Sequence, residues 1–106
     1  MKKLSSEEFR KVVESGKIVA VDFYADWCMP CRYLSPVLEK LEKEYNGRVE
    51  FYKVNVDEEQ EIAFEYGISS IPTVLFFKDG KIIGGFVGAM PEREVREEID
   101  KILEYN

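Results

Sequence analysis

At 106 residues the chain is large enough for one domain, residues 1–106, with a single hydrophobic core. Its net charge of −6 argues against nucleic-acid binding, which requires a basic face, and favours a monomer through self-repulsion. No apolar run approaches the ~20 residues of a membrane span, and the first residues lack the apolar stretch of a secretory signal. We therefore expect a cytoplasmic protein that contacts neither nucleic acid nor membrane. Abundant Glu and Lys, with one Gln and no His, are typical of a heat-adapted source.

Residues 6–15 are predicted to form a short amphipathic helix. A capping box at Ser5 and Glu8 precedes apolar residues at helical spacing, and Gly16 is suited to end the helix. Only four residues precede Ser5, so any strand before this helix must be very short.

Residues 18–24 are predicted to form a central strand, because their apolar side chains are nearly continuous, as in strands covered on both faces. Asp22 interrupts this run. It is either a solvated carboxylate near the strand end or a buried one. Burial would raise its pKa, because a low dielectric disfavours the charged form.

A long helix is predicted over residues 29–45, where apolar residues recur at helical spacing. Pro36 lies inside it and removes one hydrogen bond, which predicts a kink. Residues 49–56 read as the next strand, and a strand–helix–strand unit of this kind should be parallel and right-handed. Lys53 stands within this strand, either as a surface lysine or as a partner for Asp22 on the neighbouring strand.

Two further helices are expected. Asp57 is predicted to cap a short helix over residues 58–66, whose acidic first turn complements the positive end of the helix dipole and which Gly67 would end. The last helix should begin at Pro91, where the missing N–H of proline costs little.

A hairpin is predicted between these two helices. Residues 74–77 and 81–87 are apolar runs that flank a turn signal at residues 78–81. Gly84 and Gly85 mark a bulge or a sheet edge in the second run. The order of elements therefore indicates an α/β fold with a mixed sheet of four to five strands and helices on both faces.

Both cysteines lie where the strand over residues 18–24 gives way to the helix over residues 29–45. A helix N-terminus carries unpaired N–H groups and partial positive charge, which favours a thiolate. Cys28 and Cys31 lie about one turn apart on one helix face, and Pro30 suits the first turn. A structural disulfide, a zinc site and a dimer that bridges a metal are the alternatives. A redox dithiol is favoured, because the loop is short and the chain offers no metal ligand set.

Five stretches in this order resemble the thioredoxin family, and the resemblance covers nearly the whole chain. They are residues 21–31, 53–57, 67–73, 77–80 and 87–89. The resemblance implies the thioredoxin fold and a thiol–disulfide oxidoreductase that reduces protein disulfides. It implies that Cys28 is an exposed nucleophile and that Cys31, deeper in the helix, resolves the mixed disulfide. Asp22 would then accept the proton of Cys31, and Lys53 would tune Asp22.

The same resemblance implies a docking surface for client proteins. Pro72 is expected to be cis and to face the cysteines, with the backbone of Ile71 pairing with the client peptide. The remaining members of this surface are Trp27, Met29, Pro30, Gly88 and Ala89. No bound cofactor or metal is expected. Electrons would come from a separate thioredoxin reductase, either a flavoprotein or a ferredoxin-linked enzyme, and would pass to disulfide-containing clients.

Two departures from the family pattern concern this site. Met29 stands where thioredoxins usually carry Gly, which adds an exposed side chain beside the cysteines, and Tyr24 replaces the more usual Trp. Two alternative functions stay open from the sequence, a disulfide isomerase or oxidase and a thioredoxin-like binding subunit whose thiols matter little. The reduction potential separates the first alternative from a reductase.

Overall fold

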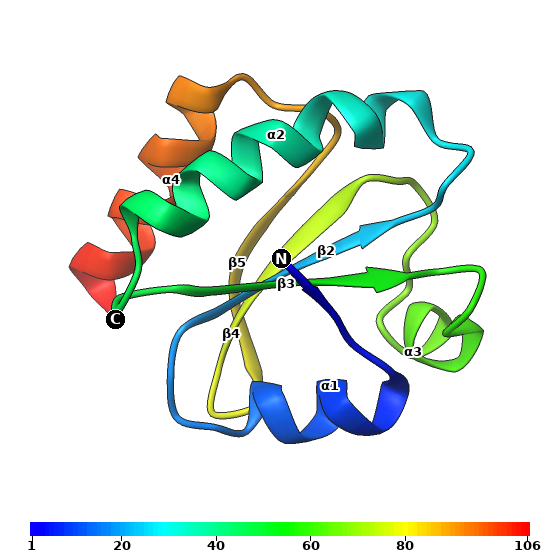
Figure 1. Ribbon diagram of the computed structural model, residues 1–106. Helices are drawn as coiled ribbons and strands as arrows, with labels where there is room; N and C mark the ends of the chain where they lie inside the picture. The colour runs from blue at the N-terminus through cyan, green and yellow to red at the C-terminus, as the bar shows by residue number, and fades with distance from the viewer.

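The computed structural model describes all residues from 1 to 106 (Figure 1). The elements in chain order are β1 (Lys2–Lys3), α1 (Ser6–Val13), β2 (Val19–Tyr24), α2 (Met29–Glu44), β3 (Glu50–Asn55), α3 (Gln60–Glu65), β4 (Thr73–Lys78), β5 (Lys81–Val87) and α4 (Glu92–Tyr105). The five strands form one sheet in the order β1-β3-β2-β4-β5. No helix is long and apolar enough to cross a membrane.

The sheet is mixed, as predicted. β1 and β2 each pair with β3 in parallel, whereas β4 is antiparallel to both β2 and β5. Helices α2 and α4 cover one face, and α1 and α3 cover the other (Figure 1). This arrangement confirms the expected α/β fold. The strand before α1 exists but spans only two residues, in line with the few residues available there.

The central strand β2 separates two buried clusters because its side chains alternate between the faces of the sheet. Val19, Val21 and Phe23 belong to the cluster beneath α1, which also contains Phe9. Ala20 belongs to the cluster under α2 and α4. Asp22 and Tyr24 share the parity of Ala20, so they lie on the face that α2 covers.

Helix α1 begins as predicted and ends early. The Ser5 side chain accepts from the N–H of Glu8 and the Glu8 side chain accepts from the N–H of Ser5, which confirms the capping box. The helix ends at Val13 rather than residue 15, because the N–H of Ser15 turns back to the carbonyl of Val12. Gly16 follows with φ of +85°, a backbone conformation that favours glycine.

The predicted cap of α3 is wrong. The helix begins at Gln60, and the residue before it, Glu59, makes no capping hydrogen bond with its side chain. The side chain of buried Asn55 accepts instead from the N–H groups of Asp57 and Glu58, at 2.9 and 3.2 Å. Asn55 therefore forms the turn that precedes the helix and leaves the carboxylate of Asp57 for another partner.

The bulge in the hairpin lies one residue before the predicted position. Phe76 pairs with Gly84 and Phe77 pairs with Ile82, so Ile83 is the extra residue on β5. Gly85 is required for a different reason, since a Cβ there would lie 2.7 Å from the backbone carbonyl oxygen of Val74 on β4. The prediction of an edge strand at β5 is confirmed by the strand order.

Candidate active site

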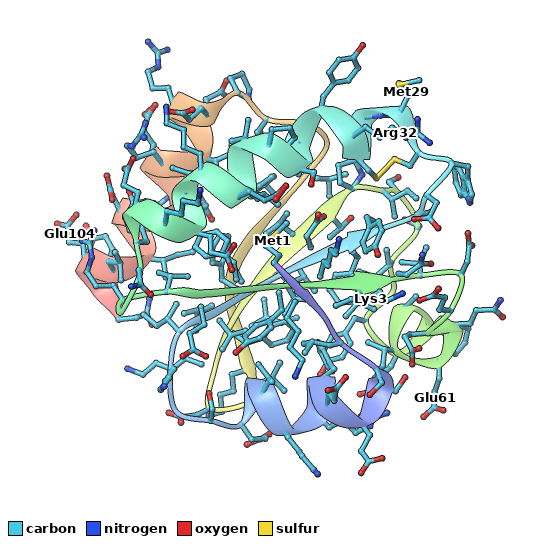
Figure 2. All side chains as sticks on the ribbon, viewed as in Figure 1. Met1, Lys3, Met29, Arg32, Glu61 and Glu104 are labelled. Carbon is cyan, nitrogen blue, oxygen red and sulfur yellow. A yellow bond between two sulfur atoms is a disulfide. The ribbon has the colours of Figure 1, made fainter.

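The two cysteines form a disulfide across the first turn of α2. Cys28 is the N-cap residue, and its Sγ accepts from the N–H of Cys31 at 3.2 Å. Pro30 lies in the first turn, where its missing N–H has no helical partner to lose. Figure 2 shows the sulfur–sulfur bond beside Met29 and Arg32, at the end of α2 nearest β2. After reduction, the same N–H and the helix dipole would stabilise a thiolate on Cys28.

Neither sulfur-bearing residue is exposed in this oxidised state. Cys28 is 3% exposed and Cys31 is 4% exposed, and both pack with Ala25 and against Ile71. The expectation of an exposed Cys28 above a deeper Cys31 is therefore wrong for the disulfide form. The two cysteines are buried to nearly the same extent, which the position of Cys28 at the helix start does not reveal.

The Ile71–Pro72 peptide bond is cis, as the family resemblance implied. The carbonyl oxygen of Ile71 lies 3.7 Å from Sγ of Cys28, so the proline loop faces the disulfide. The N–H of Gly88 donates to the carbonyl of Pro72 at 2.8 Å, which attaches the end of β5 to the same loop. Three segments that are distant in sequence therefore meet at the cysteines.

The remaining residues of the predicted docking surface surround this junction with different exposures. Trp27 is 70% exposed and Met29 is 57% exposed, and Pro30 and Ala89 are also exposed. Ile71 and Gly88 are half-buried, whereas Pro72 is buried. Ala89 follows Gly88 directly in the chain, so the hydrogen bond of Gly88 to Pro72 places Ala89 next to the proline loop.

Asp57 is a member of the site that the sequence did not indicate. Its Oδ2 accepts from the indole N–H of Trp27 at 2.7 Å, which fixes the orientation of an otherwise exposed ring. The two residues are separated by thirty positions. An aspartate just before a helix is typical of a cap, so the local pattern favoured a different role.

Asp22 is buried on the face of the sheet that α2 covers. It is 3% exposed, and its Oδ1 has no hydrogen-bond partner. Burial raises the pKa of Asp22 from 3.8 to about 7, and the positive charge of Lys53 opposes this rise. The alternative of a solvated strand-end carboxylate is therefore excluded, and Asp22 can both accept and release a proton near neutral pH.

A cleft of about 370 Å³ connects Asp22 with Cys31. Its lining includes Asp22, Tyr24, Asp26, Cys31, Arg32 and Lys53. Lys53 lies directly opposite Asp22 in the pairing of β3 with β2. It forms no ion pair with Asp22, and its ammonium lies 5.3 Å from the ring centroid of Tyr24. No group of three or more His, Cys, Asp or Glu residues could hold a metal ion.

Two cysteines joined across the first turn of a helix, facing a cis-proline and a buried carboxyl group, define a site for dithiol–disulfide exchange. The thioredoxin family model matches residues 1–101. The chain belongs to the thioredoxin family.

Individual relatives agree with this assignment. A chloroplastic M-type thioredoxin of Pisum sativum is 46% identical over 92 residues, which are 87% of this chain and 54% of the pea protein. The chain thus spans about half the length of the chloroplast relative. A thioredoxin of Staphylococcus aureus is 42% identical over 95% of this chain and 96% of its own length. The crystallographic structure of Fasciola hepatica thioredoxin superimposes with a TM-score of 0.87 at 40% identity, covering 95% of this chain and 98% of that one.

Proposed function

We propose that this protein reduces disulfide bonds in client proteins through a reversible Cys28–Cys31 dithiol. The observation that supports the proposal is the disulfide at the N-terminus of α2, with the Ile71–Pro72 backbone against it and Asp22 behind it. Family membership supports the same chemistry and does not favour a disulfide isomerase or oxidase.

In the first step, the reduced Cys28 thiolate attacks one sulfur of a client disulfide. A bond forms between Cys28 and that sulfur, and the second client sulfur leaves as a thiolate and takes up a proton. The positive end of α2 and the N–H of Cys31 stabilise the attacking thiolate. Pro72 and the carbonyl of Ile71 hold the extended client segment beside Cys28.

In the second step, Cys31 resolves the mixed disulfide. The carboxylate of Asp22 takes the proton from the Cys31 thiol through the cleft that both residues line. The resulting thiolate attacks Sγ of Cys28, which forms the disulfide seen in the structure and expels the remaining client sulfur. The client has then gained two electrons, and the Cys28–Cys31 pair has lost two.

The exposed apolar side chains beside Cys28 provide the surface on which clients dock. Trp27 and Met29 flank the sulfur and are more than half exposed, and Asp57 holds the Trp27 ring in place. Met29 adds a flexible and polarizable side chain at this surface, which suits clients of varied shape. Pro30, Gly88 and Ala89 complete the surface.

Electrons reach the oxidised pair from a separate reductase, which is a flavoprotein or a ferredoxin-linked enzyme. We place the protein in the cytoplasm, where thiols are kept reduced and a lone cysteine pair is more often catalytic than structural. Subcellular fractionation of the source organism tests this placement, and recovery outside the cytoplasm would contradict it.

The activity is tested by insulin reduction with dithiothreitol as the electron donor. The wild-type protein should accelerate precipitation of the insulin B chain, and Cys28→Ser should have no activity. Ser15→Ala, far from the site on the α1–β2 loop, is the control and should match the wild type. Activity retained in Cys28→Ser would refute the proposal. Cys31→Ser should trap mixed disulfides in a native extract, and these identify the clients and, by their identity, the electron donor.

A further inference from the structure

The ammonium group of Lys53 has two possible partners on the neighbouring strand. Asp22 and Tyr24 lie two residues apart on β2 and therefore on one face of the sheet, and Lys53 pairs in register with Asp22. The ammonium lies over the ring of Tyr24, 5.3 Å from its centroid, and forms no ion pair with Asp22. This distance is typical of an attraction between a cation and an aromatic face.

The other charged groups near Asp22 do not replace Lys53. Arg32, from α2, donates to the backbone carbonyl of Asp26 at 3.0 Å. Asp26 is exposed on the loop before α2, and the residue that faces Asp22 from β4 is the apolar Val74. Cys31, the remaining titratable group of the cleft, is bonded to its partner sulfur in this state. Lys53 is thus the one cation whose distance from Asp22 affects the pKa of that carboxyl group.

We propose that Tyr24 is a positioning residue: its ring holds the Lys53 ammonium away from Asp22 and so preserves the basicity of that carboxylate. Removing the ring would leave the ammonium in a half-buried cleft with two carboxylates, the exposed one of Asp26 and the buried one of Asp22, and Asp22 is the one that lies opposite Lys53 in register. A close ion pair would favour the charged form of Asp22 and weaken it as a proton acceptor. This role extends the proposed function, because it matters to catalysis only if Asp22 takes the proton of Cys31.

The proposal is tested by NMR titration of the Asp22 carboxyl carbon in the oxidised protein. Tyr24→Leu should lower the pKa of Asp22 by about 1, the low end of the effect of an adjacent opposite charge. Tyr24→Phe keeps the aromatic face and should leave this pKa unchanged. In a Lys53→Met background, Tyr24→Leu should have no effect, because the ammonium that would move is absent.

The proposal would be overturned by an Asp22 pKa that is unchanged or raised in Tyr24→Leu, by an equal decrease in Tyr24→Phe, or by a decrease that persists without Lys53. If Tyr24→Leu does not fold, the wild-type spectrum decides the question. The Lys53 Cε protons must then show the upfield shift that a nearby ring face produces, and ordinary lysine shifts would refute the proposal. The titration needs neither a client nor a reductase, so failure of the proposed function would leave its outcome unaffected.

Discussion

The buried carboxyl of Asp22 should lower the free energy of unfolding above neutral pH, and Asp22→Asn should restore the lost stability. The pKa of Asp22 is about 7 in the folded protein against an ordinary value of 3.8. Between these values the folded chain holds a proton that the unfolded chain has lost, so the free energy of unfolding falls as the pH rises. Each pKa unit is worth about 1.36 kcal/mol, so the penalty reaches about 4 kcal/mol above pH ~7. Because the residue is 3% exposed, solvent screens little of it.

Urea denaturation of the oxidised wild type and of Asp22→Asn, measured from acid to alkaline pH, checks this magnitude. The two proteins should be equally stable near pH ~2.5, below both pKa values, where Asp22 is neutral in the folded and the unfolded chain, and the variant should gain about 4 kcal/mol by pH ~8.5. Asp26→Asn removes an exposed carboxylate from the same cleft and is the matched control, with a difference within about 0.5 kcal/mol at any pH. A difference for Asp22→Asn that does not change with pH would refute the reasoning.

Three further predictions concern catalysis, the core and the surface. In stopped-flow measurements, the resolving step should accelerate as the pH rises through about 7, the pKa of Asp22, and this dependence should be absent in Asp22→Asn; equal slowing of both exchange steps would contradict the assigned role. Phe9→Ala should lower the free energy of unfolding by about 3–5 kcal/mol, because the fully buried ring meets three other aromatic rings edge-on; a loss below about 1 kcal/mol in urea denaturation would show that the cavity collapses. Arg96→Met should lower the urea midpoint in low salt, because Arg96 links α4 to Glu44 of α2 at 2.9 Å; the effect should vanish in about 1 M sodium chloride, where screening acts within ~3 Å, and a salt-independent effect would point to lost packing instead.

The sequence predicts the architecture well where one local rule dominates. The capping box at Ser5 leaves no competing structure for the start of α1. The apolar run around Val21 reads as a central strand, and its strand has a neighbour on each side in the sheet. Asp22 stands out because a lone carboxylate in such a run is rare, and the amino-acid pattern by itself therefore raises the possibility of burial. The cis bond before Pro72 is different, because only the family resemblance suggests it.

The features of the site that the sequence did not predict depend on contacts between segments that are far apart in the chain. Asp57 reads locally as a helix cap, but Asn55 satisfies the N–H groups there and Asp57 binds Trp27. The burial of Cys28 depends on where the loop at Ile71 lies, which no pattern around the cysteines encodes. The position of the Lys53 ammonium is likewise a choice between two neighbours that the sequence alone cannot decide.

The disulfide closes a ring confined to the N-cap and first turn of one helix, joining residues only three positions apart. Opening such a small ring releases no strand or helix from its neighbours. We therefore expect the reduced and the oxidised protein to have the same overall conformation. In the proposed function, a reductase must recognise the oxidised protein and a client must recognise the reduced protein. Both partners nevertheless meet nearly the same surface. The distinction between them therefore has to be made from a handful of atoms around two sulfurs, which places the direction of electron flow in local chemistry rather than in a change of conformation.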